Sequence, residues 1–89
     1  MSEENNPTTI YTIADRFIHL ANEINKEDSS GIVGVGFRYA AARYSAFEAT
    51  MRTNDLAADK EKIIEEYIDD YRKMLSENFD DYAKRMTHN

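Results

Sequence analysis

The sequence predicts an all-α protein, folded as an antiparallel three-helix bundle with a long third helix. Apolar residues recur at steps of three and four in three separate segments, which is the spacing of a helix with one buried face. Short polar runs separate the segments, and short connections make neighbouring helices antiparallel. No segment alternates apolar and polar residues as a half-buried strand would. We therefore expect helices throughout the domain.

The first helix is expected to begin at Asn6-Pro7, because Asn can cap a helix and Pro is tolerated at its first position. The polar run 25–31 ends it, and Ser29 or Ser30 can cap the next helix. The apolar stripe of this helix comprises Ile10, Ile13, Phe17, Leu20 or Ala21, and Ile24.

The second helix carries a heptad-like stripe that continues to the end of the segment. Its weak part is the start, where Gly31, Gly34 and Gly36 fall close together. Each interior glycine costs roughly 0.5–1 kcal/mol relative to Ala, so this helix begins either near Ser30 or only at Phe37. The stripe consists of Val33, Phe37, Ala40, Tyr44, Phe47 and Met51.

The third helix follows a turn at 53–55, with Asn54 or Asp55 as its cap, and runs over 55–86 without Pro or Gly. It is longer than the helices before it, so its apolar end extends beyond them. Either the helix bends near Ser76 and folds back over the first helix, or a second subunit covers its end. The stripe comprises Ile64, Tyr67, Ile68, Tyr71, Leu75, Phe79, Tyr82 and Met86.

Antiparallel neighbours pair by their distance from the turn that joins them. Across the first turn, Ala21 is expected opposite Gly36 and Phe17 opposite Ala40, which would allow close packing.

Across the second turn, Arg43 is expected near Glu66. We predict a structural ion pair between Arg43 and either Glu66 or Asp70, because an arginine inside a packing segment needs a carboxylate partner.

Composition limits the function classes. The formal net charge of −6 arises from residues 55–81, which hold ten acidic and four basic residues. Such a surface repels phosphate groups, so neither nucleic acid nor an anionic membrane is an expected partner. The acidic start differs from a signal peptide, and no apolar run is long enough to cross a bilayer, so we expect a cytoplasmic protein. We expect a disordered tail at 1–6, one three-helix domain at 7–86 and a short tail at 87–89.

Motifs for catalysis, cofactors and metals are weak. The glycine spacing over 31–38 lacks the Lys-Ser/Thr of a phosphate-binding loop. Neither His19 nor His88 has a Glu three positions before it, as helical metal sites require. The chain has no cysteine, hence no thiol nucleophile or zinc-thiolate site. We expect no catalytic residue, no cofactor and no metal, and therefore no enzyme.

Three blocks of the sequence resemble a known family. They are Phe17-Ile-x-Leu-Ala-Asn22, Tyr39-Ala-Ala-Ala-Arg-Tyr-Ser-Ala-Phe47 and Tyr71-Arg-Lys-Met-Leu-x-Glu-Asn-Phe-Asp-Asp-Tyr82. Together they resemble the bacterial family called Domain of Unknown Function 3144. The resemblance implies a small, acidic, bacterial cytoplasmic protein and assigns no activity. Ser45, where we associate the family with Asn, departs from the pattern, as do Gly34 and Gly36.

Two functions remain open from the sequence. The first is an interaction module that self-associates or binds another protein through the end of the third helix. Its candidate interface consists of Glu77, Asn78, Phe79, Asp80, Tyr82 and Met86, a polar cluster beside apolar groups. The second is a helical bundle that binds a small ligand or metal near Arg43, with Tyr39, Tyr44 and the facing carboxylates.

Overall fold

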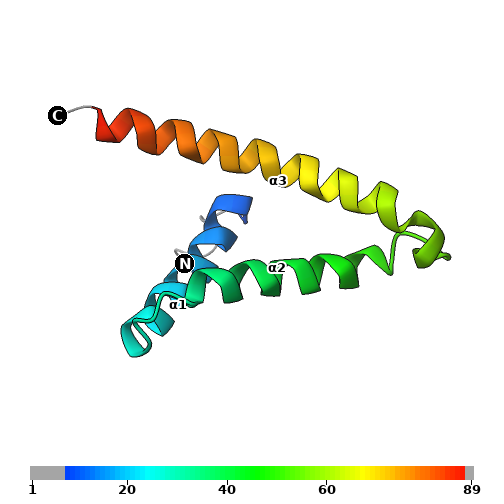
Figure 1. Cartoon of the computed structure of the whole chain (residues 1–89), viewed down its shortest axis with the longest axis horizontal. Helices are drawn as coiled ribbons and strands as arrows, with labels where there is room; N and C mark the ends of the chain where they lie inside the picture. Colours follow the sequence, from blue (N-terminus) through cyan, green and yellow to red (C-terminus); the bar gives the residue numbers. More distant parts are fainter. Residues whose placement is uncertain (1–7, 88–89) are drawn as a thin grey trace. The chain divides into compact units, whose positions relative to one another are not determined.

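The chain folds into three α-helices joined by two short turns (Figure 1). The computed structural model describes residues 8–87, in which α1 spans Ile10–Glu27, α2 spans Val33–Ala49 and α3 spans Leu56–Met86. No strand occurs in this part of the chain, so the all-α prediction with a long third helix is confirmed. The helices form two compact units, one ending at Arg43 and the other beginning at Tyr44. The expected tail at 1–6 lies outside the described residues.

The start of α1 is fixed by a reciprocal pair of hydrogen bonds. The Thr12 N–H donates to Oγ1 of Thr9 at 3.1 Å, and the Thr9 N–H donates to Oγ1 of Thr12 at 3.0 Å. This capping box satisfies backbone donors that have no partner within the helix. The expected start at Asn6-Pro7 lies outside the described residues, and the helix seen there begins after Thr9.

The turn between α1 and α2 is held by its own polar groups. The Asp28 N–H donates to the Ile24 carbonyl at 2.9 Å, and the Ser30 N–H donates to Oδ1 of Asp28 at 3.0 Å. Gly31 has a φ of +90°, a conformation that glycine adopts without the strain of a Cβ. Ser30 accepts from the Ile32 N–H at 3.3 Å, so it stabilises the turn ahead of α2.

Helix α2 is regular from Val33 and includes both Gly34 and Gly36. A Cβ placed on Gly36 would meet nothing within 4 Å, so the predicted close approach of Ala21 to Gly36 is wrong. Phe17 is also more than half exposed, and the expected packing of Phe17 on Ala40 does not enclose it. No neighbouring group therefore excludes a side chain at Gly34 or Gly36.

Helix α2 ends at Ala49, before the last residue of its predicted stripe. The N–H groups of Thr50, Met51 and Arg52 donate to carbonyls three residues back, which tightens the chain into a turn. Met51 lies in this turn and is 70% exposed, so its assignment to the apolar face of the second helix is wrong.

Helix α3 begins where the sequence predicts, with Asp55 as its cap. Oδ1 of Asp55 accepts from the Ala58 N–H at 3.1 Å. The helix continues for 31 residues without interruption at Ser76, so the predicted bend there is wrong (Figure 1). At 1.5 Å per residue α3 is about 46 Å long, against about 27 Å for α1 and about 25 Å for α2.

Burial is concentrated where α2 passes into α3. Ala49 and Ile63 are the buried residues of the described chain, with 4% and 6% of their surfaces exposed. Thr53 and Asp59 lie beside them, half-buried, and the Thr53 hydroxyl donates to Oδ2 of Asp59 at 2.5 Å. This small cluster belongs entirely to the second unit and fixes the first turns of α3 against the end of α2.

Candidate functional site

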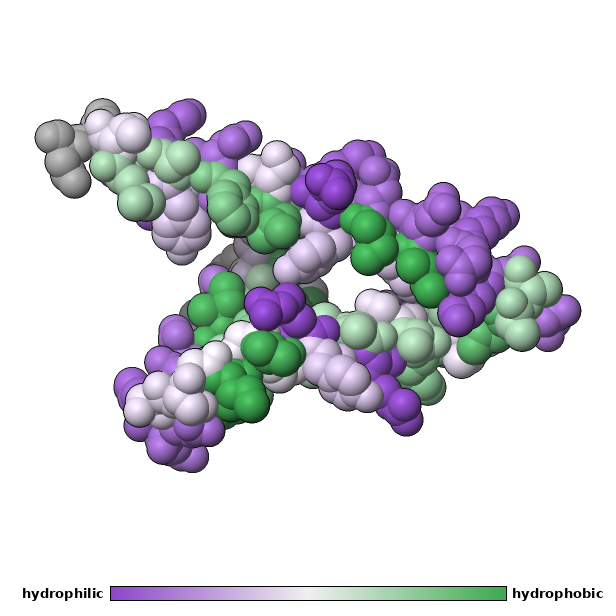
Figure 2. Space-filling model, in the orientation of Figure 1, coloured by the Kyte–Doolittle hydropathy of each residue, from purple (hydrophilic) through white to green (hydrophobic). Residues whose placement is uncertain are grey.

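Most of the apolar surface of α3 lies outside that cluster. Seven residues recur along one side of the helix and each is at least 42% exposed: Ile64, Ile68, Tyr71, Leu75, Phe79, Tyr82 and Met86. We call these seven residues the α3 stripe. Figure 2 shows hydrophobic side chains following one side of α3 and hydrophilic ones the other. A contiguous exposed apolar face of this kind is typical of an interaction surface.

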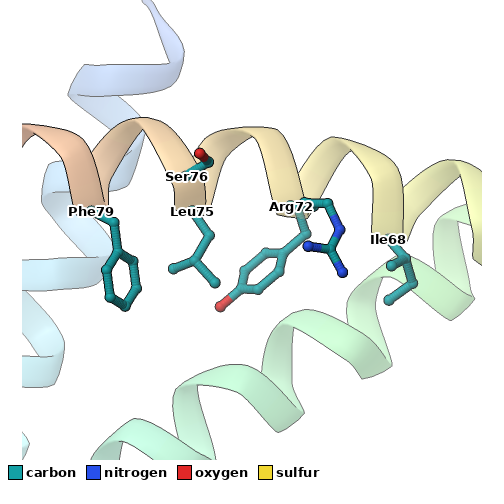
Figure 3. A pocket seen from close by; sticks show the side chains of 6 residues that line it. Ile68, Arg72, Leu75, Ser76 and Phe79 are labelled. Atoms are coloured by element: carbon teal, nitrogen blue, oxygen red, sulfur yellow. The ribbon is translucent and has the colours of Figure 1, made fainter.

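The middle of the α3 stripe forms a shallow hollow on the helix surface. Its lining residues all come from α3: Ile68, Tyr71, Arg72, Leu75, Ser76 and Phe79. In Figure 3, the side chains of Ile68, Leu75 and Phe79 point to the same side of the helix. Since one helix supplies every lining residue, the hollow is open to the outside along α3.

The six residues of the predicted interface all lie in the last turns of α3, but they do not share one face. At 100° per residue, Phe79, Tyr82 and Met86 lie on the α3 stripe, whereas Glu77 and Asp80 lie on the opposite side of the helix. Asn78 lies at the edge, where its Nδ2 donates to the Met74 carbonyl at 2.8 Å. The helix geometry therefore separates the apolar part of the predicted interface from most of its acidic part.

A basic residue borders the end of the stripe. The guanidinium of Arg85 lies over the Tyr82 ring, with 5.8 Å between its Cζ and the ring centroid. Nε of Arg85 also lies 3.1 Å from Oδ2 of Asp81, one turn earlier. The cation is thus held between the edge of the apolar stripe and the acidic side of the helix.

Glu66 forms an ion pair with Arg52. Nη2 of Arg52 lies 2.5 Å from Oε1 of Glu66, and the Arg52 guanidinium lies 5.6 Å from the centroid of the Tyr67 ring. The hydrogen bond from Arg52 lowers the pKa of Glu66 and raises that of Arg52. Arg43 closes the first unit, so its pairing with Glu66 or Asp70 stays a prediction.

Arg52 was assigned no role from the sequence, because it was placed inside the second helix. No spacing rule points to its contact with Glu66, because the two residues are 14 positions apart and the turn brings them together.

In the region proposed for a ligand near Arg43, two aromatic side chains are well exposed: Tyr39 is 69% exposed and Tyr44 is 62% exposed. The Tyr44 ring contacts Phe47 on its own helix at a centroid distance of 6.0 Å. Nothing here favours the alternative of a ligand-binding bundle.

The described residues offer neither a metal cluster nor a membrane-spanning helix. Within residues 8–87, no three side chains of His, Asp or Glu come together as metal ligands. No helix in the described part of the chain combines the length and the apolar character needed to cross a membrane.

Comparison with known proteins gives a family and no activity. Searches of curated proteins and of solved structures found no match to the chain. A family model described as a protein of unknown function, DUF3144, matches residues 10–83, which include α1, α2 and most of α3. The match covers far more than half of the sequence and agrees with the resemblance of its three blocks. The chain belongs to the DUF3144 family of proteins of unknown function.

Proposed function

We propose that this protein is a non-catalytic interaction module that binds another polypeptide through the exposed stripe of α3. The observation that carries the proposal is the position of Leu75, Phe79, Tyr82 and Met86. These residues are 43–76% exposed, and they lie beyond the part of α3 that a helix of the length of α2 can cover.

The lengths of α1 and α2 limit how far either helix can reach along α3. Helix α2 has 17 residues, so paired antiparallel from the shared turn it reaches about as far as residue 73 of α3. Helix α1 has 18 residues and, in an up-down-up bundle, would start at the same end. About a dozen residues of α3 therefore extend past both neighbours, and five of them are large and apolar: Met74, Leu75, Phe79, Tyr82 and Met86.

The contact that α3 makes with α2 uses a different side of the helix. Ile63 is buried, whereas Ile64, about 100° further round the helix, is 42% exposed. Tyr67 is half-buried, whereas Ile68 is 56% exposed. The α3 stripe is thus available over its whole length after the second unit has formed.

The test is a double substitution, Phe79→Asp with Tyr82→Asp, studied at a protein concentration at which the parent is monomeric. For a binding surface, helix content and unfolding free energy should remain close to those of the parent. A matched control is Lys73→Gln with Lys84→Gln, which makes the same change in net charge on the other side of α3. A monomeric Asp variant that loses helix content while the control does not would show that these residues belong to the protein's own core, and would refute the proposal.

A further inference from the structure

The spacing of the α3 stripe indicates what binds to it. Its seven residues follow steps of 4, 3, 4, 4, 3 and 4, so that Ile64, Leu75 and Met86 are separated by 11 residues each. Ile68 and Phe79, and likewise Tyr71 and Tyr82, are also 11 residues apart. An 11-residue repeat has 3.67 residues per turn, close to the period of a straight α-helix. The stripe therefore stays on one side of α3 for its whole length, as a helix that packs along another helix requires.

Counted from Leu75, the steps between stripe residues are the same toward Ile64 as toward Met86, namely 4, 3 and 4 residues. If a second copy of α3 lies antiparallel with Leu75 as the centre, Tyr71 is level with Phe79 of the second copy, and Ile68 with Tyr82. Ile64 is then level with Met86, so every residue of the stripe lies level with another residue of the stripe. An antiparallel pair shifted by one residue loses this correspondence. A parallel pair in register would place each stripe residue level with its own copy, so the direction of the pair rests on the charges and the helix dipoles.

We propose that two copies of this protein pair through their α3 stripes in an antiparallel dimer whose two-fold axis passes beside Leu75. This inference rests on the proposed function and names the partner as a second copy of the chain. The hollow lined by Ile68, Leu75 and Phe79 is the centre of the pairing surface (Figure 3).

The charges of α3 are compatible with this pairing. Of its seven acidic residues between Ile64 and Met86, six lie at least 120° from the stripe: Glu66, Asp69, Asp70, Glu77, Asp80 and Asp81. The stripe of an acidic protein is thus nearly free of negative charge, and the acidic sides of the two helices point away from each other. At such separations their repulsion is largely screened at physiological ionic strength.

The antiparallel direction also suits the two ends of the stripe. Arg85, which borders the stripe in the last turn of α3, becomes level with Glu65, which borders the stripe of the second copy. A parallel pair would instead make Arg85 level with its own copy. The helix dipoles likewise favour the antiparallel arrangement.

The surface area that pairing would bury is typical of a specific dimer that exchanges with the monomer. The seven side chains are about half exposed in each copy, so pairing would bury roughly 1,000 Å² over both copies, near the lower limit of specific protein interfaces. We expect a concentration-dependent equilibrium between monomer and dimer.

Light scattering after size exclusion, over a range of concentrations, tests for the dimer. The intact chain should pass from monomer to dimer, and Phe79→Asp with Tyr82→Asp should weaken dimerisation at least about 30-fold, because both residues lie in the buried part of the pair. The control Lys73→Gln with Lys84→Gln should still dimerise. An intact chain that is monomeric at every concentration would overturn the dimer while leaving a different protein partner for the same surface.

The absence of cysteine permits a direct test of direction and register. Leu75→Cys should form an intermolecular disulfide under mild oxidation, because the two copies of residue 75 meet at the axis. Ile64→Cys and Met86→Cys should each fail to cross-link alone and should cross-link when the two variants are mixed. Disulfides of Ile64→Cys or Met86→Cys with themselves would indicate a parallel pair and overturn the antiparallel dimer. A dimer in which neither Leu75→Cys nor the mixture cross-links would overturn it as well. The proposed binding surface is refuted by a different result, the loss of the monomer's own fold in the variant Phe79→Asp with Tyr82→Asp.

Discussion

Arg52 and Glu66 join the turn after α2 to the end of the third turn of α3, with 2.5 Å between Nη2 and Oε1. The guanidinium also lies over Tyr67, the residue after Glu66. Both charged side chains remain about half exposed, at 43% and 45%, so this contact orients the turn more than it stabilises the fold.

We expect this contact to make stability depend on pH below neutrality. The hydrogen bond from Arg52 holds the pKa of Glu66 below its ordinary value of 4.5 in the folded state. The stabilisation is therefore fully present above the unfolded-state pKa and is lost as the pH falls through the lower, folded-state pKa. Urea unfolding from pH 7 to pH 3 should show a small advantage of the parent over Glu66→Gln at pH 7 that disappears at the acid end.

The neighbouring carboxylate of Glu65 is the control for that titration. Glu65→Gln changes the net charge equally without removing the partner of Arg52. An identical pH profile for Glu65→Gln and Glu66→Gln would contradict a specific role of the Arg52 contact.

The cap of α3 allows a prediction of larger size. Asp55→Ala removes the oxygen that accepts from the Ala58 N–H and should lower the free energy of unfolding by about 1 kcal/mol. Asp55→Asn keeps an oxygen in the same place and should retain most of the stability. Thermal and urea unfolding followed by circular dichroism would measure both. A loss for Asn as large as that for Ala would mean that the negative charge near the helix N-terminus, rather than the cap, is what matters.

The helices themselves follow from local signals in the sequence. Apolar residues at three- and four-residue steps predicted all three, and Asp55 was one of the two residues, with Asn54, that were expected to cap α3 because they precede an apolar run. The end of α2 was placed too late, because the apolar Met51 continues the heptad pattern into the turn. A stripe read from spacing alone does not show where the backbone leaves the helix.

Long-range contacts were less predictable. The pairing of Ala21 with Gly36 assumed that small residues mark a close approach, but open space surrounds Gly36. The bend at Ser76 assumed that the apolar end of α3 had to be covered by its own chain. A helix without Pro or Gly has no local reason to bend, and α3 stays continuous. The exposed groups Phe79, Tyr82 and Met86 were identified correctly as lying on this helix end, whereas the Arg52–Glu66 contact depends on the geometry of the turn and was missed.

The glycines of the first turn and of α2 should respond in opposite directions to the same substitution. Gly36→Ala adds a Cβ into open space within a helix and should stabilise the fold by about 0.5–1 kcal/mol. Gly31→Ala places a Cβ at a φ of +90° and should destabilise it by about 1 kcal/mol. Unfolding free energies of both variants at one protein concentration would check this. A destabilising Gly36→Ala would reveal a contact at Gly36 that forms only in an assembly.

Two adjacent isoleucines should separate the folding surface of α3 from its binding surface. Ile63 is 6% exposed and lies against the end of α2, so Ile63→Ala should cost about 2 kcal/mol or more of unfolding free energy, even in dilute monomer. Ile64 is 42% exposed and belongs to the α3 stripe, so Ile64→Ala should cost well under half of that in the monomer. The second variant should instead weaken dimerisation, because Ile64 is expected level with Met86 of the second copy. Chemical unfolding of dilute protein and light scattering of concentrated protein measure the two effects independently. Equal losses of monomer stability for both substitutions would mean that both sides of α3 pack in the protein's own core. The α3 stripe would then not be a surface that binds a partner.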